Sequence, residues 1–113
     1  MNVEVREAES GVWVVVPEGN IDVITSVDLK RRVYGITHTP QCKLVFNLEK
    51  VDYLDSAGLE AFIHILKNVK QQKGKISFCG VDTGVHRTLE VLGLNKIFQI
   101  YPQEDSAILY LKE

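Results

Sequence analysis

The feature that most constrains this chain of 113 residues is an alternation of short apolar runs with longer segments of helical periodicity. The first two runs, NVEVREAE and GVWVVVPE, are separated by Ser10 and Gly11, a pair that favours a turn. They predict an antiparallel hairpin whose second strand ends at Pro17. Strand-like and helix-like segments alternate after it, which predicts crossover connections between parallel strands. The sequence therefore predicts an α/β fold.

Local signals give the expected bounds of the other elements. The spacing of TSVD matches a capping box, so a first helix is expected to start near Ser26 and to end at Gly35. Strands are expected at CKLVFNLE, KISFCGV and KIFQIY, and helices over about 57–73, over DTGVHRTLEVLG with Asp82 or Thr83 as cap, and over QEDSAILYLK. We expect one domain, residues 1–113, with a mixed sheet of about five strands and about four α-helices.

The longest expected helix has two distinct faces. Its polar residues recur every three or four positions and form one exposed stripe, made by Glu60, His64, Lys67 and Gln71. Apolar residues fill the rest of the helix surface. An apolar face of this width predicts that the helix packs on a sheet.

Charge and hydropathy exclude two classes of partner. The chain has 13 Lys and Arg against 15 Asp and Glu, a net charge of −2, and its cations form no basic stripe. Direct nucleic-acid binding is therefore not expected. No apolar run approaches the roughly 20 residues that span a bilayer, and the N-terminal residues lack the pattern of a secretory signal. We expect no membrane contact and a cytoplasmic location.

Cysteines and histidines do not suggest a metal or a cofactor. Cys42 and Cys79 lie far apart and match neither zinc-ligand spacing nor a disulfide framework. His38, His64 and His86 are equally scattered, so no second ligand shares a helix face with any of them. Both cysteines are interpreted as reduced structural thiols, and no metal or cofactor is expected.

Motifs for catalysis are also missing. The chain contains neither glycine-rich phosphate-binding motif, and the residues around Ser56 do not form a nucleophile elbow. His64 lies two helical turns beyond Ser56 on the solvent stripe, about 12 Å along the axis. Asp52 and Asp55 are close in sequence, and Asp22 is expected nearby because loops that follow neighbouring parallel strands gather at one end of the sheet. These acids could hold a cation or act as acid and base, but solvated loop acids are the preferred interpretation. No catalytic residue is assigned.

Ser56 remains distinctive because it stands where an apolar strand gives way to an apolar helix. As a helix N-cap its side chain would accept amide hydrogen bonds, worth about 1 kcal/mol. Capping leaves unexplained a glycine in the first turn, Gly58, which weakens a helix by up to about 1 kcal/mol relative to alanine. Small residues at 57 and 58 would also leave the serine accessible to another protein's active site.

The segment DYLDSAGLEAF resembles the phosphorylation site of STAS domains, in particular the bacterial anti-sigma factor antagonists, whose strand-to-helix junction reads Asp-Ser-Ser/Ala-Gly-Leu. GNID resembles the family's Gly-x-hydrophobic-Asp loop, and the segment from GVDTG to AILYL resembles its C-terminal half. The resemblance covers the whole chain and implies a single-domain STAS fold.

The resemblance implies a partner switch in transcription regulation. An unphosphorylated antagonist binds an anti-sigma factor, which is also a serine kinase, and so releases a sigma factor. Phosphorylation breaks the complex, and a PP2C-type phosphatase restores it. By this resemblance Ser56 matches the phosphorylated serine, Asp55 and Gly58 match its framing residues, and Asp22 matches the loop acid near it. The predicted partner-binding residues are Asp22, Asp55, Ala57, Gly58 and Glu60.

Two positions depart from the family pattern. Ala57 replaces a second serine and so removes an alternative acceptor, and Glu60 places an acid where the family often has a small residue. Glu60 is a candidate for selecting the kinase that docks. The resemblance further implies a non-enzymatic protein that is a monomer or a weak dimer.

Two other hypotheses remain open at this stage. A STAS module without a switch, either a stressosome scaffold or a lipid-transporter subunit, would use Ser56 only as a helix cap. A small serine hydrolase or nucleotide-binding enzyme is disfavoured by the missing motifs.

Overall fold

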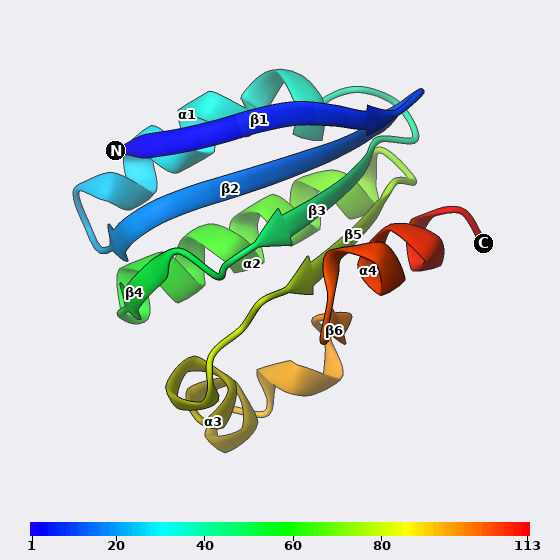
Figure 1. The fold of residues 1–113 in the computed structure, drawn as a ribbon. Helices are drawn as coiled ribbons and strands as arrows, with labels where there is room; N and C mark the ends of the chain where they lie inside the picture. Colours follow the sequence, from blue (N-terminus) through cyan, green and yellow to red (C-terminus); the bar gives the residue numbers. More distant parts are fainter.

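The computed structural model describes residues 1–113 as one layered α/β structure (Figure 1). The first half contains β1 (Asn2–Glu9), β2 (Val12–Ile21), α1 (Thr25–Thr37), β3 (Lys43–Asn47), β4 (Val51–Leu54) and α2 (Ser56–Gln71). The second half contains β5 (Lys75–Cys79), α3 (Thr83–Val91), the 3₁₀ turn η1 (Leu94–Lys96), β6 (Ile100–Tyr101) and α4 (Glu104–Leu111).

The six strands form one mixed sheet with the order β1-β2-β3-β5-β6. Strand β1 pairs antiparallel with β2, and every other pairing is parallel. The α/β fold with an N-terminal antiparallel hairpin and four α-helices is therefore confirmed. The remaining strand, β4, lies outside this order and pairs with the last residues of β2.

Helices cover both faces of the sheet (Figure 1). On one face, residues of α1 and α2 share a hydrophobic cluster of 19 buried residues with the strands. On the other face, Ala107 and Leu111 of α4 pack with Val14, Val45 and Cys79 in a smaller cluster of 7 buried residues. The sheet is therefore apolar on both sides, as the continuous apolar runs in the sequence require.

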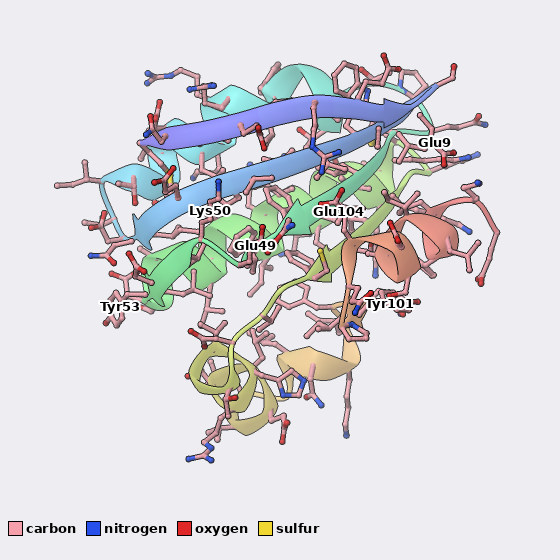
Figure 2. All side chains as sticks on the ribbon, viewed as in Figure 1. Glu9, Glu49, Lys50, Tyr53, Tyr101 and Glu104 are labelled. Atoms are coloured by element: carbon pink, nitrogen blue, oxygen red, sulfur yellow. The ribbon has the colours of Figure 1, made fainter.

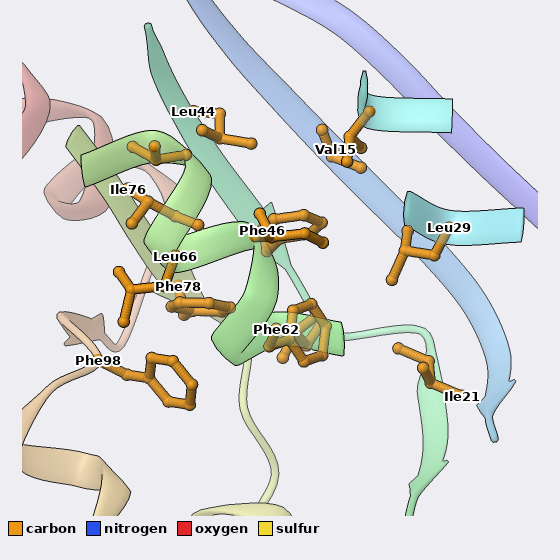
Figure 3. Packing of buried hydrophobic residues seen from close by; sticks show 14 of the residues in the cluster. Val15, Ile21, Leu29, Leu44, Phe46, Phe62, Leu66, Ile76, Phe78 and Phe98 are labelled. Carbon is orange, nitrogen blue, oxygen red and sulfur yellow. The ribbon is translucent and has the colours of Figure 1, made fainter. Parts of the chain in front are cut away.

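Four phenylalanines form the centre of the larger cluster (Figure 3). Phe62 of α2 meets Phe46 and Phe78 of the sheet edge-to-face, with ring centroids 5.1 and 5.4 Å apart. Phe98 packs against Phe78, with the two ring centroids 4.9 Å apart. These contacts fix α2 on the sheet, and its first residue is Ser56.

Strand β2 continues through Pro17, so the expected strand end at that residue was wrong. Pro17 is opposite Val3, whose carbonyl points away from β2 and accepts from Arg32 Nη2 at 2.8 Å. Pairing with β3 ends at Val15, and pairing with β4 begins at Gly19. The missing N–H of Pro17 thus faces a gap in the ladder, where no hydrogen bond is lost.

CKLVFNLE was expected to form the one strand between the first helix and the Ser56 junction, but the structure has two strands in this region. Strand β3 ends at Asn47, and a turn over 48–50 leads to β4. The turn is closed by a hydrogen bond from the Val51 amide to the Leu48 carbonyl at 3.0 Å. With only four residues and two exposed side chains, β4 gives no periodic signal in the sequence.

Helix α1 starts at Thr25, as expected near Ser26, but the expected capping box and the expected end at Gly35 were wrong. Thr25 and Asp28 form no capping box, since Asp28 pairs with the Met1 ammonium group at 3.2 Å. The helix passes through Gly35 and ends at Thr37. It stops there because residues just before a proline, here Pro40, are disfavoured in helical conformation.

Other expectations are confirmed. The polar residues that were expected to form a stripe on α2 are all exposed, and Asp82 caps α3 by accepting from the Val85 amide at 2.8 Å.

No helix of this structure has both the length and the apolar composition needed to cross a bilayer.

The Phe62 contacts predict a large loss of stability on truncation. We expect Phe62→Ala to lower the free energy of unfolding by about 3–5 kcal/mol, because a side chain that is 1 % exposed leaves a cavity between two rings. Leu109→Ala, on the solvent side of α4 and 63 % exposed, is the control and should cost less than about 0.5 kcal/mol. Urea denaturation of both variants measures this, and equal losses would contradict it.

Candidate functional site

Parallel pairing of β2 and β4 creates the candidate site. Ile21 and Leu54 are the last paired residues of these strands, so the residues that follow them, Asp22 and Asp55, leave the sheet at the same edge. The Asp55 amide also donates to the Ile21 carbonyl at 3.3 Å. The expectation that these loops gather at one end of the sheet is therefore confirmed.

Asp55, not Ser56, caps helix α2. Its backbone is extended, and its Oδ1 accepts from the Gly58 amide at 3.0 Å. The Leu59 amide bonds to the Asp55 carbonyl at 3.0 Å and starts the helical ladder. The interpretation of Ser56 as the N-cap was wrong, because the preceding aspartate already fills that position.

Ser56 is the first residue of α2 and is exposed to solvent. Its hydroxyl forms no hydrogen bond within the protein, so it has neither a capping role nor a histidine base. The side chain stands at the positive end of the helix dipole, where an added negative charge is tolerated. The Ser56 hydroxyl is therefore accessible from outside the protein.

Asp22 organises the loop between β2 and α1. Its Oδ1 accepts from the backbone amides of Ile24 at 2.9 Å and of Thr25 at 3.0 Å. Thr25 Oγ1 in turn accepts from the Asp22 amide at 2.9 Å and donates to the Asn20 carbonyl at 2.7 Å. Hydrogen bonds from the Thr25 and Ile24 amides lower the pKa of the Asp22 carboxyl below its ordinary value.

Gly58 is buried where α2 passes over the end of β2. A Cβ at this position would lie 2.6 Å from the Ile21 carbonyl oxygen and would also collide with the Leu54 side chain. The close approach explains why the first turn of the helix contains glycine. Gly58 therefore determines how closely α2 approaches β2, and Ala57 beside it in the sequence is half-buried.

Large apolar side chains are exposed on the two segments that meet at this edge of the sheet. Val23 and Ile24, in the loop after Asp22, are 68 % and 78 % exposed, and Tyr53 of β4 is 56 % exposed. Figure 2 shows Tyr53 pointing outward at the β4 end of the molecule. These three residues were not among the candidates found in the sequence. Two adjacent apolar residues in a polar loop, Val23 and Ile24, could have indicated an exposed apolar surface.

Exposed acids complete the surface. Asp52 of β4 and Glu60 of α2 are both exposed, and Glu60 is one helical turn from Ser56. No three His, Cys, Asp or Glu side chains converge in a geometry that would hold a metal ion. The surface therefore combines apolar and acidic groups around one free hydroxyl, a composition suited to contact with another protein.

Both cysteines are buried away from this surface. Cys79 lies in β5, and burial, with smaller contributions from the nearby charges of Glu104 and Glu49, raises the pKa of its thiol to about 12. A thiol with such a pKa is a poor nucleophile, so the interpretation of Cys79 as structural agrees with its surroundings.

The STAS domain family model matches residues 3–107. The chain belongs to the STAS domain family. Among curated proteins, this STAS domain is 32% identical over 114 residues to an anti-sigma F factor antagonist of Paenibacillus polymyxa, with 99% of this chain and 97% of the relative covered. The Ser56 junction is therefore embedded in a chain that matches that relative from end to end.

Solved structures show the same fold. The STAS domain superposes on an anti-sigma factor antagonist from Mycobacterium paratuberculosis with a TM-score of 0.85 and 26% identity, covering 99% and 94% of the two chains. It also shares its fold with the Bacillus cell fate determinant SpoIIAA in the phosphorylated form, with a TM-score of 0.70 and 13% identity, covering 95% and 96%.

Replacing glycine by alanine should have opposite effects on stability at two positions in the helices. Gly58→Ala should lower the free energy of unfolding by about 1–2 kcal/mol, because collision with the Ile21 carbonyl outweighs the gain in helix propensity. Gly35→Ala, in α1 with open space around it, should raise stability by up to about 1 kcal/mol. Urea denaturation measures both, and a stabilised Gly58→Ala variant would show that α2 does not approach β2 this closely.

Substitutions of Asp22 separate the role of its oxygen from that of its charge. Asp22→Asn keeps an oxygen for the two amides and should lower the melting temperature less than Asp22→Ala. The folded pKa of Asp22 is lowered, so its contribution to stability is present above its ordinary pKa of 3.8 and is lost as pH falls through the folded pKa.

Thermal melts between about pH 6 and about pH 3 measure this effect. The difference between the wild type and Asp22→Asn should shrink toward the acid end. A difference that grows on acidification would contradict the role assigned to the charge.

Proposed function

We propose that this STAS domain is an anti-sigma factor antagonist that is switched off by phosphorylation of Ser56. In its unphosphorylated form it binds a cytoplasmic anti-sigma factor with serine kinase activity and so releases a sigma factor. A PP2C-type phosphatase reverses the modification. The observation that carries the proposal is the exposed, unbonded Ser56 hydroxyl at the start of α2, in a chain whose relatives are named anti-sigma factor antagonists.

The exposed surface supports a protein partner. Val23, Ile24 and Tyr53 are more than half exposed, and burying large apolar side chains of this kind is the main source of affinity in protein interfaces. They lie on the two chain segments that flank the serine. A partner that covers them would also cover the Ser56 hydroxyl.

Phosphorylation would change this surface without requiring a new fold. A phosphoserine adds about 1.5 to 2 negative charges. The dipole of α2 favours an anion at its first residue by about 0.3–1 kcal/mol. Asp55 already supplies the cap, so Ser56 gives up no hydrogen bond when it is modified. The helix should therefore remain intact.

The same modification would strongly weaken binding to a partner protein. The new charge would join Asp52 and Glu60 on the exposed side of the junction. Like charges placed together in an interface cost several kcal/mol. A cost of about 3 kcal/mol corresponds to more than a hundredfold in affinity. Charge and shape, with a nearly unchanged backbone, are thus sufficient for the proposed switch.

We propose different roles for the six predicted site residues, based on how exposed each one is. Ser56 and Glu60 are exposed and can contact a kinase directly, and Glu60 would help to select it. Asp22, Asp55 and Gly58 hold the two loops in place through the contacts described above, and Ala57 leaves the serine uncovered. We further propose that the domain acts as a monomer or a weak dimer and has no enzymatic activity of its own.

Two substitutions at Ser56 test the switch. As baits in the lysate of the source cell, Ser56→Ala should retain an ATPase of the anti-sigma type, whereas Ser56→Asp should lose it. Isothermal titration with that purified protein should give at least a hundredfold weaker binding for Ser56→Asp, for the electrostatic reason above.

Ser10→Asp is the matched control, because it adds the same charge to an exposed serine in the β1–β2 turn. It should bind like the wild type. If Ser56→Ala and Ser56→Asp bind the same proteins equally, the proposed switch is refuted, and a constitutive scaffold or transporter subunit becomes the better hypothesis.

A further inference from the structure

A buried polar network joins the first residue of α4 to the turn that precedes β4. Asn47, at the end of β3, is 7 % exposed, so both ends of its amide need partners. Its Nδ2 donates to Glu104 Oε2 at 3.1 Å, and its Oδ1 accepts from the Glu49 amide at 3.1 Å. One buried side chain therefore holds α4 at one end and the turn at the other.

Glu104 is fixed from two sides. Arg6 of β1 donates a charge-assisted hydrogen bond to Oε1, while Oε2 accepts from Asn47. One turn further along α4, the Ala107 carbonyl accepts from Ser77 Oγ at 3.0 Å. The bonds to Arg6 and Asn47 connect Glu104 to both β1 and β3.

The turn in question leads directly to the Ser56 junction. Asn47 sets the position of the Glu49 amide, and the carbonyl of the next residue, Lys50, accepts from the Gly19 amide of β2 at 2.9 Å. Strand β4 starts at the following residue and ends one residue before Asp55, the cap of α2. Figure 2 shows Glu49 and Lys50 in this turn and Glu104 at the start of α4.

Close packing leaves the turn little room to move independently. Gly80, which follows β5, has a φ of +67° and lies against Asn47 and Glu49. A Cβ on Gly80 would be 2.8 Å from Asn47 Oδ1 and 2.9 Å from the Glu49 amide nitrogen. The Oδ1 end of the Asn47 amide is thus enclosed by Gly80 and the turn.

We propose that Glu104 and Asn47 are positioning residues for the Ser56 junction. Glu104 holds the Asn47 amide, Asn47 holds the 48–50 turn, and the turn sets where β4 places Asp55 and Ser56. Helix α4 thereby controls how well ordered the surface around Ser56 is, although α4 lies on the other face of the sheet. The effect on partner binding rests on the proposed function, whereas the effect on the junction does not.

Hydrogen exchange of the purified protein tests the coupling. Glu104→Ala removes an acceptor from both Asn47 and Arg6, and it should speed amide exchange over 48–59 by about tenfold, the effect expected for a buried donor left unpaired. Asp105→Ala is the matched control, since it removes a neighbouring exposed acid from the same first turn of α4. It should leave exchange over 48–59 unchanged.

Asn47→Ala supplies a second and directional readout. It releases the turn but keeps the pairing of Arg6 with Glu104, so exchange should increase over 48–59 while α4 remains protected. If Glu104→Ala proves poorly folded, Glu104→Gln retains an oxygen for Asn47 and should show the same pattern with a smaller increase. Faster exchange confined to α4, or spread evenly over all elements, would overturn the proposal.

Titration of the anti-sigma type partner separates this proposal from the proposed function. If both hold, Glu104→Ala should weaken binding by about tenfold and Asp105→Ala should not, while Ser56→Asp abolishes binding in each background. If Ser56→Asp has no effect but exchange over 48–59 responds to Glu104→Ala, the phosphorylation switch fails and the positioning role stands. If Ser56→Asp acts as expected but exchange does not respond, only the positioning role fails.

Discussion

The candidate site depends on the way strand β2 changes its parallel partner along its length. Its first half pairs with β3 and its last residues pair with β4, and Pro17 occupies the gap between the two ladders. A residue without an N–H is suited to that gap because no partner strand faces it. The change of partner brings the ends of β2 and β4 together, and therefore brings together the two loops that begin with Asp22 and Asp55.

The close approach of α2 to the end of β2 then places the serine. Gly58 allows the helix to pass directly over the Ile21 carbonyl, and the phenylalanine contacts of Phe62 hold the same helix on the sheet one turn later. Asp55 supplies the cap, which leaves the Ser56 hydroxyl without a structural task. A modification at that hydroxyl therefore acts on the surface of the protein and not on its core.

Most of the fold could be predicted from the sequence because most elements carry a strong local signal. The two-faced pattern of α2 and the apolar runs of β2, β3 and β5 are long enough to be read directly. Strand β4 was missed because four residues carry no clear period, and the Thr25–Asp28 motif was misleading because Asp28 bonds to the chain terminus instead. Ser56 was found because it stands between an apolar strand and an apolar helix. Val23, Ile24 and Tyr53 were missed because their exposure depends on which neighbours cover them.

The sequence by itself determined the order of every element except β4 and the short 3₁₀ turn, the apolar faces that bury them and the position of Ser56 at a strand-to-helix junction. These properties follow from residue periodicity and local capping chemistry, which act over a few neighbouring residues. Only the tertiary structure decided that Asp55 is the cap, that Gly58 is required by the Ile21 carbonyl, and that Glu104 reaches Asn47 across 57 residues of chain. Those contacts join segments distant in sequence, and no local pattern encodes which distant atoms will meet.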